Sequence, residues 1–362
     1  GLNEALEDYV VAGNLPEQTK RQYAYAVRRF IELNGDLAID ELTKDHLREF
    51  ARVSPGLPAS HKNECASWPI LEAVAETERL GLKKISSATV TKHLTALRTL
   101  AKHAAGSGLA EIDPFDGFRH KIPKARYSDE KNRERQPFSR GELQRVVSAV
   151  RSTLKPTCDD YWIPFIALYH GARLEEICQL ELADVGAEDG VAFMDITDEG
   201  QAGKKVKNAA SVRRVPIHAA LIEMGFLEHV KRSGDGIYVF SSLIADERGR
   251  RGGAYGKRFG RLLRKVARIA DRRKVFHSFR HTWTDAARNA GLPEDVRLRL
   301  AGRELKGSEG GYGKGHNLAV QYDWLSKVDP FGGVSERELE NEHRNERAGS
   351  ENLNSGISGF SA

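Results

Sequence analysis

Apolar residues recur at helical spacing through most of the first 115 or so residues of the chain. The spacing predicts helices over Pro16–Leu33, Leu42–Val53, Trp68–Leu80 and Ser87–Ala105. Basic residues lie off the apolar stripes, as Lys92, Arg98 and Lys102 do in the last helix. Residues 1–118 are therefore expected to form a compact helical domain able to lie against a phosphate backbone, although a purely structural bundle would show the same pattern.

The helical pattern stops over residues 119–136. Pro114 precedes this segment and Pro123 lies within it, and Arg119–Arg135 contains eight basic residues when His120 is counted. Little of the segment is apolar. We interpret it as an extended linker that can run along DNA, with Arg126 as a candidate contact, while it joins two lobes of a clamp.

A second folded region is predicted over residues 137–330. Ser139 and Glu142 form a capping box that starts a helix through Arg151, and the strongly apolar Asp160–His170 predicts a buried helix. Two strands are expected at Val191–Ile196 and Val212–Ile217, separated by a Gly/Lys-rich turn region. Further helices are predicted at Arg173–Leu182, Ala219–Lys231, Tyr255–Ala270, His277–Ala290, Pro293–Leu300 and Leu318–Val328. The fold class is thus mainly α with a small β-sheet or hairpin in the second domain.

The charge distribution adds a candidate nucleic-acid surface. The net charge is +5, and the Glu-rich residues 331–362, predicted to be a disordered polar tail, contribute −3 of it. Between Arg248 and Lys274 there are twelve Lys or Arg residues and one acid. The helix expected there has an apolar stripe of Tyr255, Phe259, Leu262, Leu263, Val266 and Ile269. Its candidate DNA contacts are Lys257, Arg258, Arg261, Arg264 and Lys265; a basic face kept only for solubility is the alternative.

Several classes of protein are excluded or disfavoured. The chain has no run of 18 apolar residues and no basic-then-apolar leader, so we expect no membrane association and no secretory signal. It starts at Gly1 without methionine, which leaves a processed or truncated start open. Its three cysteines have no CxxC spacing, which argues against a disulfide scaffold or a structural zinc site and fits a reducing, cytoplasmic setting. No cofactor or metal is expected.

Four segments carry polar and cationic residues that periodicity does not require. Arg173 follows the glycine turn at Gly171, and Lys207 lies on the expected hairpin. His277 and Arg280 are three residues apart and so share a helix face. Ala301-Gly302-Arg303 is followed by a glycine-rich stretch that contains Tyr312. Each has a simple structural explanation by itself, such as an ion pair, a helix cap or an exposed aromatic, so the order of the four is the informative feature.

That order resembles the tyrosine recombinase (phage integrase) family, and the resemblance covers nearly the whole chain except the tail. Gly171-Ala172-Arg173 with Glu176 looks like the first arginine box, and Lys207 to Pro216 has the K-x3-S-x-R-x-V-P spacing of the lysine hairpin. His277 to Thr282 is close to the His-x-Leu-Arg-His-Thr box, and Tyr312 lies nine residues after Arg303. One departure is that Arg303 stands where the family usually has histidine or tryptophan; arginine keeps a hydrogen-bond donor but cannot exchange a proton near neutral pH.

The resemblance implies a two-domain DNA clamp and a metal-free mechanism. Residues 1–118 would be the helical core-binding (SAM-like) domain, and residues 137–330 the α+β catalytic domain. Tyr312 would attack a DNA phosphodiester to leave a 3′-phosphotyrosyl link and a free 5′ hydroxyl. Arg173 and Arg280 would hold the two non-bridging oxygens and Arg303 could add a third contact. His277 would position the phosphate or accept the phenol proton, Lys207 would protonate the departing 5′ oxygen, and Glu176 would orient its neighbours.

The same resemblance implies partners and leaves alternatives. Double-stranded recombination sites, a homo-tetramer on synapsed DNA and accessory DNA-bending proteins are expected, and we favour an integrase of a phage or genomic island. The helix Leu318–Val328 would either dock on a neighbouring protomer or pack on its own domain. The nearest rivals are a type IB topoisomerase and a catalytically impaired, sequence-specific DNA-binding protein. A metal-dependent nuclease is weaker, because the acidic residues are scattered.

Overall fold

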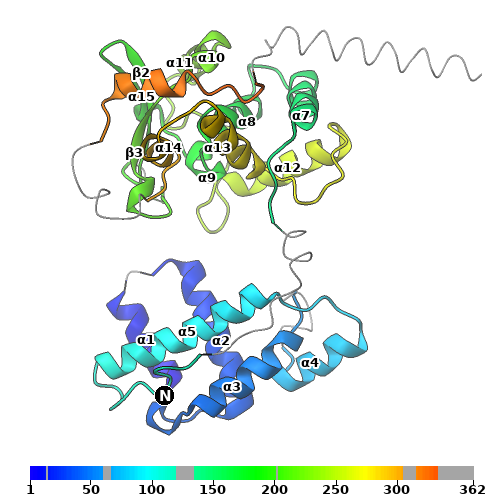
Figure 1. Ribbon diagram of the computed structural model, residues 1–362, viewed down its shortest axis with the longest axis vertical. Coiled ribbons are helices and arrows are strands. Elements are labelled where there is room, and N and C mark those ends of the chain that lie inside the picture. The colour runs from blue at the N-terminus through cyan, green and yellow to red at the C-terminus, as the bar shows by residue number, and fades with distance from the viewer. Residues whose placement is uncertain (14, 60–66, 120–133, 201–202, 305–314, 333–362) are drawn as a thin grey trace, which may run out of the picture. The chain divides into compact units, whose positions relative to one another are not determined.

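Figure 1 shows the computed structural model, which describes residues 1–13, 15–59, 67–119, 134–200, 203–304 and 315–332. The chain divides into two compact units, Gly1–Asn132 and Arg133–Ala362. Each unit has its own cluster of buried apolar side chains. The division falls inside the segment 119–136 that the sequence marks as a linker. The units are described separately below.

Unit 1 consists of helices packed around a core of aromatic and aliphatic side chains. The helices are α1 (Leu2–Ala12), α2 (Glu17–Asn34), α3 (Lys44–Val53), α4 (Ile70–Arg79) and α5 (Ser87–Gly106). The long helices α2 and α5 pack against each other, and α1 packs against both. Phe30 lies at the centre of the core, with its ring 5.5 Å from that of Phe50 and 6.2 Å from that of Phe115.

The helices predicted for unit 1 are confirmed to within two residues at each end. Helix α1 was not predicted, because it buries only Leu2 and Ala5 and so has no long apolar stripe. At the start of α5, the Ser86 hydroxyl accepts a hydrogen bond from the Thr89 backbone N–H at 3.2 Å. This side chain satisfies one of the free amides of the first helical turn, so the helix begins where the sequence places a good cap.

Unit 2 is built around α8 (Asp159–His170), which is buried on every side as its continuous apolar sequence predicts. Helix α13 (Ser278–Asn289) packs along it (Figure 1). Pro164 lies inside α8 and removes the amide that would bond to the Asp160 carbonyl. The Tyr255 hydroxyl donates to that carbonyl at 3.4 Å instead, which explains how the buried helix tolerates a proline.

A three-stranded antiparallel sheet of order β1-β2-β3 lies at one side of unit 2. The strands are β1 (Val185–Glu188), β2 (Val191–Ile196) and β3 (Arg213–Pro216), and Met194 of β2 pairs with both Val185 and Val215. The hairpin of β2 and β3 is confirmed. Strand β1 was not predicted because it is short and half exposed, although Asp189 and Gly190, both with positive φ, are a typical two-residue hairpin turn.

Some of the predicted helices of unit 2 are wrong in extent. The segment Arg173–Leu182 contains only the short helix α9 (Leu174–Cys178). The segment Ala219–Lys231 is two helices, α10 (Ala219–Glu223) and α11 (Phe226–Arg232), because Gly225 adopts a left-handed conformation between them. The remaining helices are α7 (Arg140–Thr153), α12 (Gly252–Lys265), α14 (Glu294–Leu300) and α15 (Leu318–Leu325).

Helix α12 begins earlier and ends earlier than predicted. It stops at Lys265, and Arg268 has a φ of 54°, which turns the chain away from the helix axis. Val266 is consequently 43% exposed rather than part of the apolar stripe. The Arg264 guanidinium donates to the carbonyls of Ile269 at 2.5 Å and Lys274 at 2.8 Å, so it fastens the turn that follows the helix.

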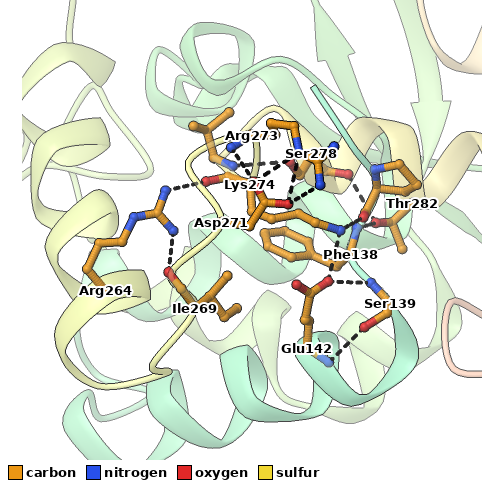
Figure 2. A network of polar contacts seen from close by, with 12 residues as sticks. Phe138, Ser139, Glu142, Arg264, Ile269, Asp271, Arg273, Lys274, Ser278 and Thr282 are labelled. Atoms are coloured by element: carbon orange, nitrogen blue, oxygen red, sulfur yellow. Dashed lines mark hydrogen bonds and ion pairs between the residues drawn. The ribbon is translucent and has the colours of Figure 1, made fainter. Parts of the chain in front are cut away.

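The segment that enters unit 2 is fixed by a network of polar contacts, drawn in Figure 2. The Lys274 ammonium lies 2.9 Å from the Glu142 carboxylate and donates to the Pro137 carbonyl. The backbone N–H of Phe138 donates to the Thr282 hydroxyl at 2.9 Å, and the rings of Phe138 and Phe279 lie 5.1 Å apart. The entering chain is thereby attached to α7 and to α13.

Helix α15 packs against β2 and β3 of its own unit in this single chain. Leu325 and Val328 are buried in the core, and the carbonyl of Val328 lies 3.1 Å from the His218 imidazole. Phe331 is also buried, so the core extends one residue into the range predicted as a tail, and residues 333–362 lie outside the described part. Among the described residues, none of the helices has the length and apolar character needed to cross a bilayer.

Candidate functional site

Arg173 is positioned by the turn between α8 and α9. Gly171 ends α8 with a φ of 61°, and a Cβ on it would lie 2.7 Å from the Trp283 ring, so only glycine fits. Arg173 follows as the N-cap of α9, and its backbone N–H donates to Glu176 Oε2 at 3.0 Å. Its guanidinium donates through Nη1 to the same carboxylate, so backbone and side chain are both held by Glu176.

Glu176 is a buried carboxylate shared by two arginines. Its Oε2 accepts a hydrogen bond from Arg213 Nη2 at 3.0 Å, and both side chains are almost completely buried. Burial by itself would raise the pKa of Glu176, but the charge of Arg213 and the hydrogen bonds outweigh it and hold this pKa below its usual value. Glu176 therefore remains ionised and fixes Arg173, as expected of an orienting group.

Arg213 was not predicted as a site residue. It donates from Nε to the Leu300 carbonyl at 2.9 Å and from Nη1 to the Ser211 carbonyl at 2.7 Å, so it ties β3 to the end of α14. The signal that could have found it is the K-x3-S-x-R spacing, in which Ser211 and Arg213 are the second and third residues. Their importance follows from a buried network that sequence spacing does not reveal.

Gly302, which follows α14, lies against both Arg173 and Arg213. Its carbonyl accepts a hydrogen bond from Arg173 Nη2 at 3.1 Å. It has a φ of 61°, and a Cβ on it would lie 2.5 Å from Arg213 Nη1. Arg303 comes next and is partly exposed; burial and then the charges of Arg297, Arg173 and Arg288 lower its pKa. The residue that departs from the family pattern thus lies within electrostatic range of Arg173.

Arg280 and His277 come from α13. Arg280 is 3% exposed and donates from Nη1 to the Gly171 carbonyl at 2.7 Å. Burial, followed by the charges of Arg173 and Arg303, lowers the pKa of Arg280 to about 9. His277 reaches solvent, yet partial burial of its ring and the neighbouring His281 and Arg280 lower its pKa to about 4. The rings of His277 and His281 are 5.3 Å apart; His281 was not predicted as a site residue.

Lys207 is exposed in the connection between β2 and β3. The next residue, Asn208, accepts a hydrogen bond from the Ser211 hydroxyl at 2.6 Å, and that hydroxyl accepts one from Arg173 Nη1 at 3.1 Å. The base of the connection is therefore linked to Arg173, while the structure gives Lys207 itself no fixed partner among its described contacts. Tyr312 and Arg126 lie outside the described residues.

Helix α12 presents part of its basic sequence to solvent. Arg258 makes two hydrogen bonds of 2.7 Å with the Asp160 carboxylate, and Arg264 bonds to backbone carbonyls as described above. Lys257, Arg261 and Lys265 are exposed. Of the five candidate DNA contacts on α12, three thus face solvent and two also stabilise the fold.

The assembled site is strongly cationic. Arg173, Arg280 and Arg303 lie close enough for their charges to act on one another, and the buried Glu176 is shared between Arg173 and Arg213. Such an arrangement suits a bound anion with several oxygens, because guanidinium groups offer planar sets of donors. Within the described residues, three or more His, Cys, Asp or Glu side chains do not come together as metal ligands would.

One curated protein is similar to most of this chain. No protein-family model matches the sequence. Tyrosine recombinase XerA from Thermococcus onnurineus (strain NA1) is 26% identical to this chain over 303 residues, which span 82% of this chain and 84% of XerA. The chain is therefore similar to a tyrosine recombinase over most of its length.

Solved structures share the fold of this chain. A λ integrase dimer bound to a COC′ core site superimposes with a TM-score of 0.53 and 13% identity, over 92% of this chain and 96% of that chain. The Tn1549 transposon integrase in complex with circular intermediate DNA has a TM-score of 0.56 and 16% identity, over 94% and 98% of the two chains. The expected fold class, mainly helical with a small sheet, is confirmed.

Proposed function

We propose that this chain is a tyrosine recombinase that cuts and rejoins DNA at specific sites, with the scissile phosphate held by Arg173, Arg280 and Arg303. The observation that carries the proposal is the convergence of these arginines from three separate segments, the α8–α9 turn, α13 and the end of α14. Burial and mutual repulsion lower the pKa of Arg280, so an anion placed among these groups would relieve an unfavourable interaction.

The partly exposed Arg173 and the buried Arg280 are both oriented before any DNA binds. Arg173 is held by Glu176 and the Gly302 carbonyl, and Arg280 by the Gly171 carbonyl. Groups fixed in this way need little reorganisation when negative charge develops on the phosphate oxygens. We assign Arg173 and Arg280 to the two non-bridging oxygens, and Arg303 to a supplementary contact.

Proton transfers are assigned to His277 and Lys207. With a pKa lowered to about 4, His277 is neutral at pH 7. A phosphate bound among the arginines would oppose the positive charges that lower this pKa, so we assign His277 to accept the phenol proton of Tyr312 in the DNA complex. The Tyr312 oxygen then bonds to phosphorus, the bond to the 5′ oxygen breaks, and the Lys207 ammonium donates a proton to that oxygen. Arg303 retains positive charge but cannot exchange a proton near neutral pH, so neither transfer is given to it.

The assembled enzyme is proposed to act as four protomers on two synapsed duplexes. Each chain supplies one Tyr312 and cuts one strand, and two duplexes have four strands. A λ integrase structure of the same fold is a tetramer bound to a Holliday junction, with a TM-score of 0.52 and 14% identity. We further propose that the reaction integrates or excises a phage or other mobile element, as the fold shared with the transposon integrase named above supports.

Covalent trapping tests the proposal. Wild-type protein and the Tyr312→Phe variant are incubated with nicked duplexes drawn from the DNA flanking the gene, and denatured samples are scored for protein attached to DNA. The nick releases the short 5′-hydroxyl strand, so a phosphotyrosyl adduct accumulates. Tyr322→Phe is the matched control, since Tyr322 lies on α15. An adduct lost only in Tyr312→Phe supports the proposal; binding without any adduct, or an adduct that survives in Tyr312→Phe, contradicts it.

A further inference from the structure

Unit 1 contains a groove of about 850 Å³ that α2 and α5 line together. Arg21, Gln22 and Arg28 of α2 and Thr91, Lys92 and Thr95 of α5 are part of its lining. None of the described residues that line it is acidic, although Glu32 approaches Arg28 at 3.6 Å from outside. Cations on both walls make the groove complementary to an anionic ligand.

A second hollow continues this surface along α5. It shares Thr95 with the groove and adds Arg98, Thr99 and Lys102, with Asp113 and Asp116 also in its lining. Lys92, Arg98 and Lys102 therefore follow one another along several turns of the same helix. A row of cations of this length fits an extended polyanion such as duplex DNA better than a small anion.

The threonines between these cations have a specific chemical character. The hydroxyl of Thr91 donates to the Ser87 carbonyl at 2.9 Å, and that of Thr95 donates to the Thr91 carbonyl at 2.8 Å. Thr99 repeats the pattern with the Thr95 carbonyl at 2.8 Å. Thr91 and Thr95 are exposed, and Thr99 is half-buried. Because their hydroxyl protons are committed to the helix backbone, these side chains offer a ligand their methyl groups and an accepting oxygen, but no hydroxyl proton.

A methyl-bearing helix face flanked by cations matches one feature of the major groove. Thymine is the standard base that presents a methyl group there, and threonine methyls are suitable contacts for it. Gln22 on the opposite wall supplies an amide that can pair with the donor and acceptor on the major-groove edge of adenine. A helix about 10–12 Å wide fits a major groove about 12 Å wide.

We infer that unit 1 selects A·T base pairs in the recombination site, with Thr91 and Thr95 as readers of thymine methyl groups. Arg21, Arg28 and Lys92 bind the flanking phosphates and position the helix without selecting sequence. The inference rests on the proposed function, because it takes the ligand of the groove to be the recombination site. It adds that unit 1 reads A·T base pairs, and that it does so through the methyl groups of thymine.

Replacement of thymine by uracil tests this inference directly, because it removes only the 5-methyl group. The full chain first selects binding sites from a pool of randomised duplexes. The selected duplex is then resynthesised with deoxyuridine at each thymidine in turn, and dissociation constants are measured for wild type, Thr91→Ser, Thr95→Ser and Thr95→Val. Thr153→Ser is the matched control, since its hydroxyl makes the same bond to the carbonyl four residues earlier, but on α7 of unit 2.

For wild type, uracil at one or more positions should weaken binding about fourfold per methyl lost. Thr91→Ser or Thr95→Ser should abolish that difference, whereas Thr95→Val and Thr153→Ser should retain it. Equal binding of thymine and uracil sites at every position by wild type would overturn the inference, as would full discrimination by both serine variants. If only the inference about thymine is wrong, the covalent adduct with Tyr312 still forms. If the proposed function is wrong, no adduct forms, so the two failures are distinguishable.

Discussion

The arginines of the site depend on residues that do no chemistry themselves. Arg173 is held from three directions, by Glu176, by Ser211 and by the Gly302 carbonyl. Arg213 lies behind this set and holds Glu176 in turn. A small change at a buried neighbour should therefore displace Arg173 even though that neighbour never contacts DNA.

Gly302→Ala is expected to damage the site more than its size suggests. The added Cβ would meet Arg213 Nη1 at 2.5 Å, and the φ of 61° disfavours any residue with a Cβ. Gly291→Ala is the matched control, because Gly291 has a φ of 72° but no atom within 4 Å of its added Cβ. Both variants should lose about 1 kcal/mol of unfolding free energy from backbone strain.

Only Gly302→Ala should also lose adduct formation, by about tenfold or more, because Arg213, Glu176 and Arg173 must all shift. Denaturant unfolding and the trapping reaction measure the two effects separately. Equal adduct yields from the two alanine variants would contradict the role given to Arg213.

At the scale of elements, α13 joins the site to the point where the chain enters unit 2. One face of α13 carries His277 and Arg280, and the same helix holds Phe138 through Thr282. Lys274, three residues before His277, holds Pro137 and Glu142 (Figure 2). The network thus fixes the start of α13 and the end of the linker segment in one place.

Lys274→Met should destabilise unit 2 by about 3 kcal/mol, because it leaves the largely buried Glu142 carboxylate without its cation. Burial raises the pKa of Glu142, but Lys274 and Ser139 outweigh it and keep this pKa below its ordinary value. The ion pair therefore stabilises the fold above the ordinary carboxyl pKa, and its contribution is lost as the pH falls through the lowered value.

The difference between wild type and Lys274→Met should accordingly shrink below about pH 4. Urea unfolding at several pH values measures this difference in unfolding free energy. Arg288→Met is the control, since Arg288 and Asp285 form an ion pair whose side chains are 60% and 51% exposed, and it should change stability very little. A pH-independent loss in Lys274→Met would mean that packing, not charge, explains the effect.

At the scale of the whole molecule, the two units have separate hydrophobic cores. Phe30 belongs to the core of unit 1 and Phe165 to that of unit 2, and both are fully or almost fully buried. Because each core is complete within its own unit, the units should unfold as two cooperative transitions rather than one.

Phe30→Ala should lower the transition of unit 1 by about 3–5 kcal/mol and leave that of unit 2 unchanged. Phe165→Ala is the reciprocal variant and should affect only unit 2. Differential scanning calorimetry of the full chain distinguishes the two transitions. A single transition that both variants shift by the same amount would show that the units are thermodynamically coupled.

The sequence by itself determined α2, α3, α4 and α5 of unit 1, the hairpin of β2 and β3, and the resemblance to one family. Periodic apolar residues and strong caps such as Ser139 act over a few neighbouring residues, so they can be read locally. The glycine turn at Gly171 gave the same kind of signal before Arg173. The order of the motifs is also a property of the chain alone, which is why the departure at Arg303 could be recognised without a structure.

Tertiary structure decided the rest. Arg213, Ser211 and His281 gained their importance from partners that lie far away in the sequence, such as the Leu300 carbonyl 87 residues after Arg213. Whether Arg258 faced solvent or Asp160, and whether α15 packed on its own sheet, depended on which surfaces the fold brought together. Long-range burial and charge pairing depend on the assembled core, and no local pattern specifies them.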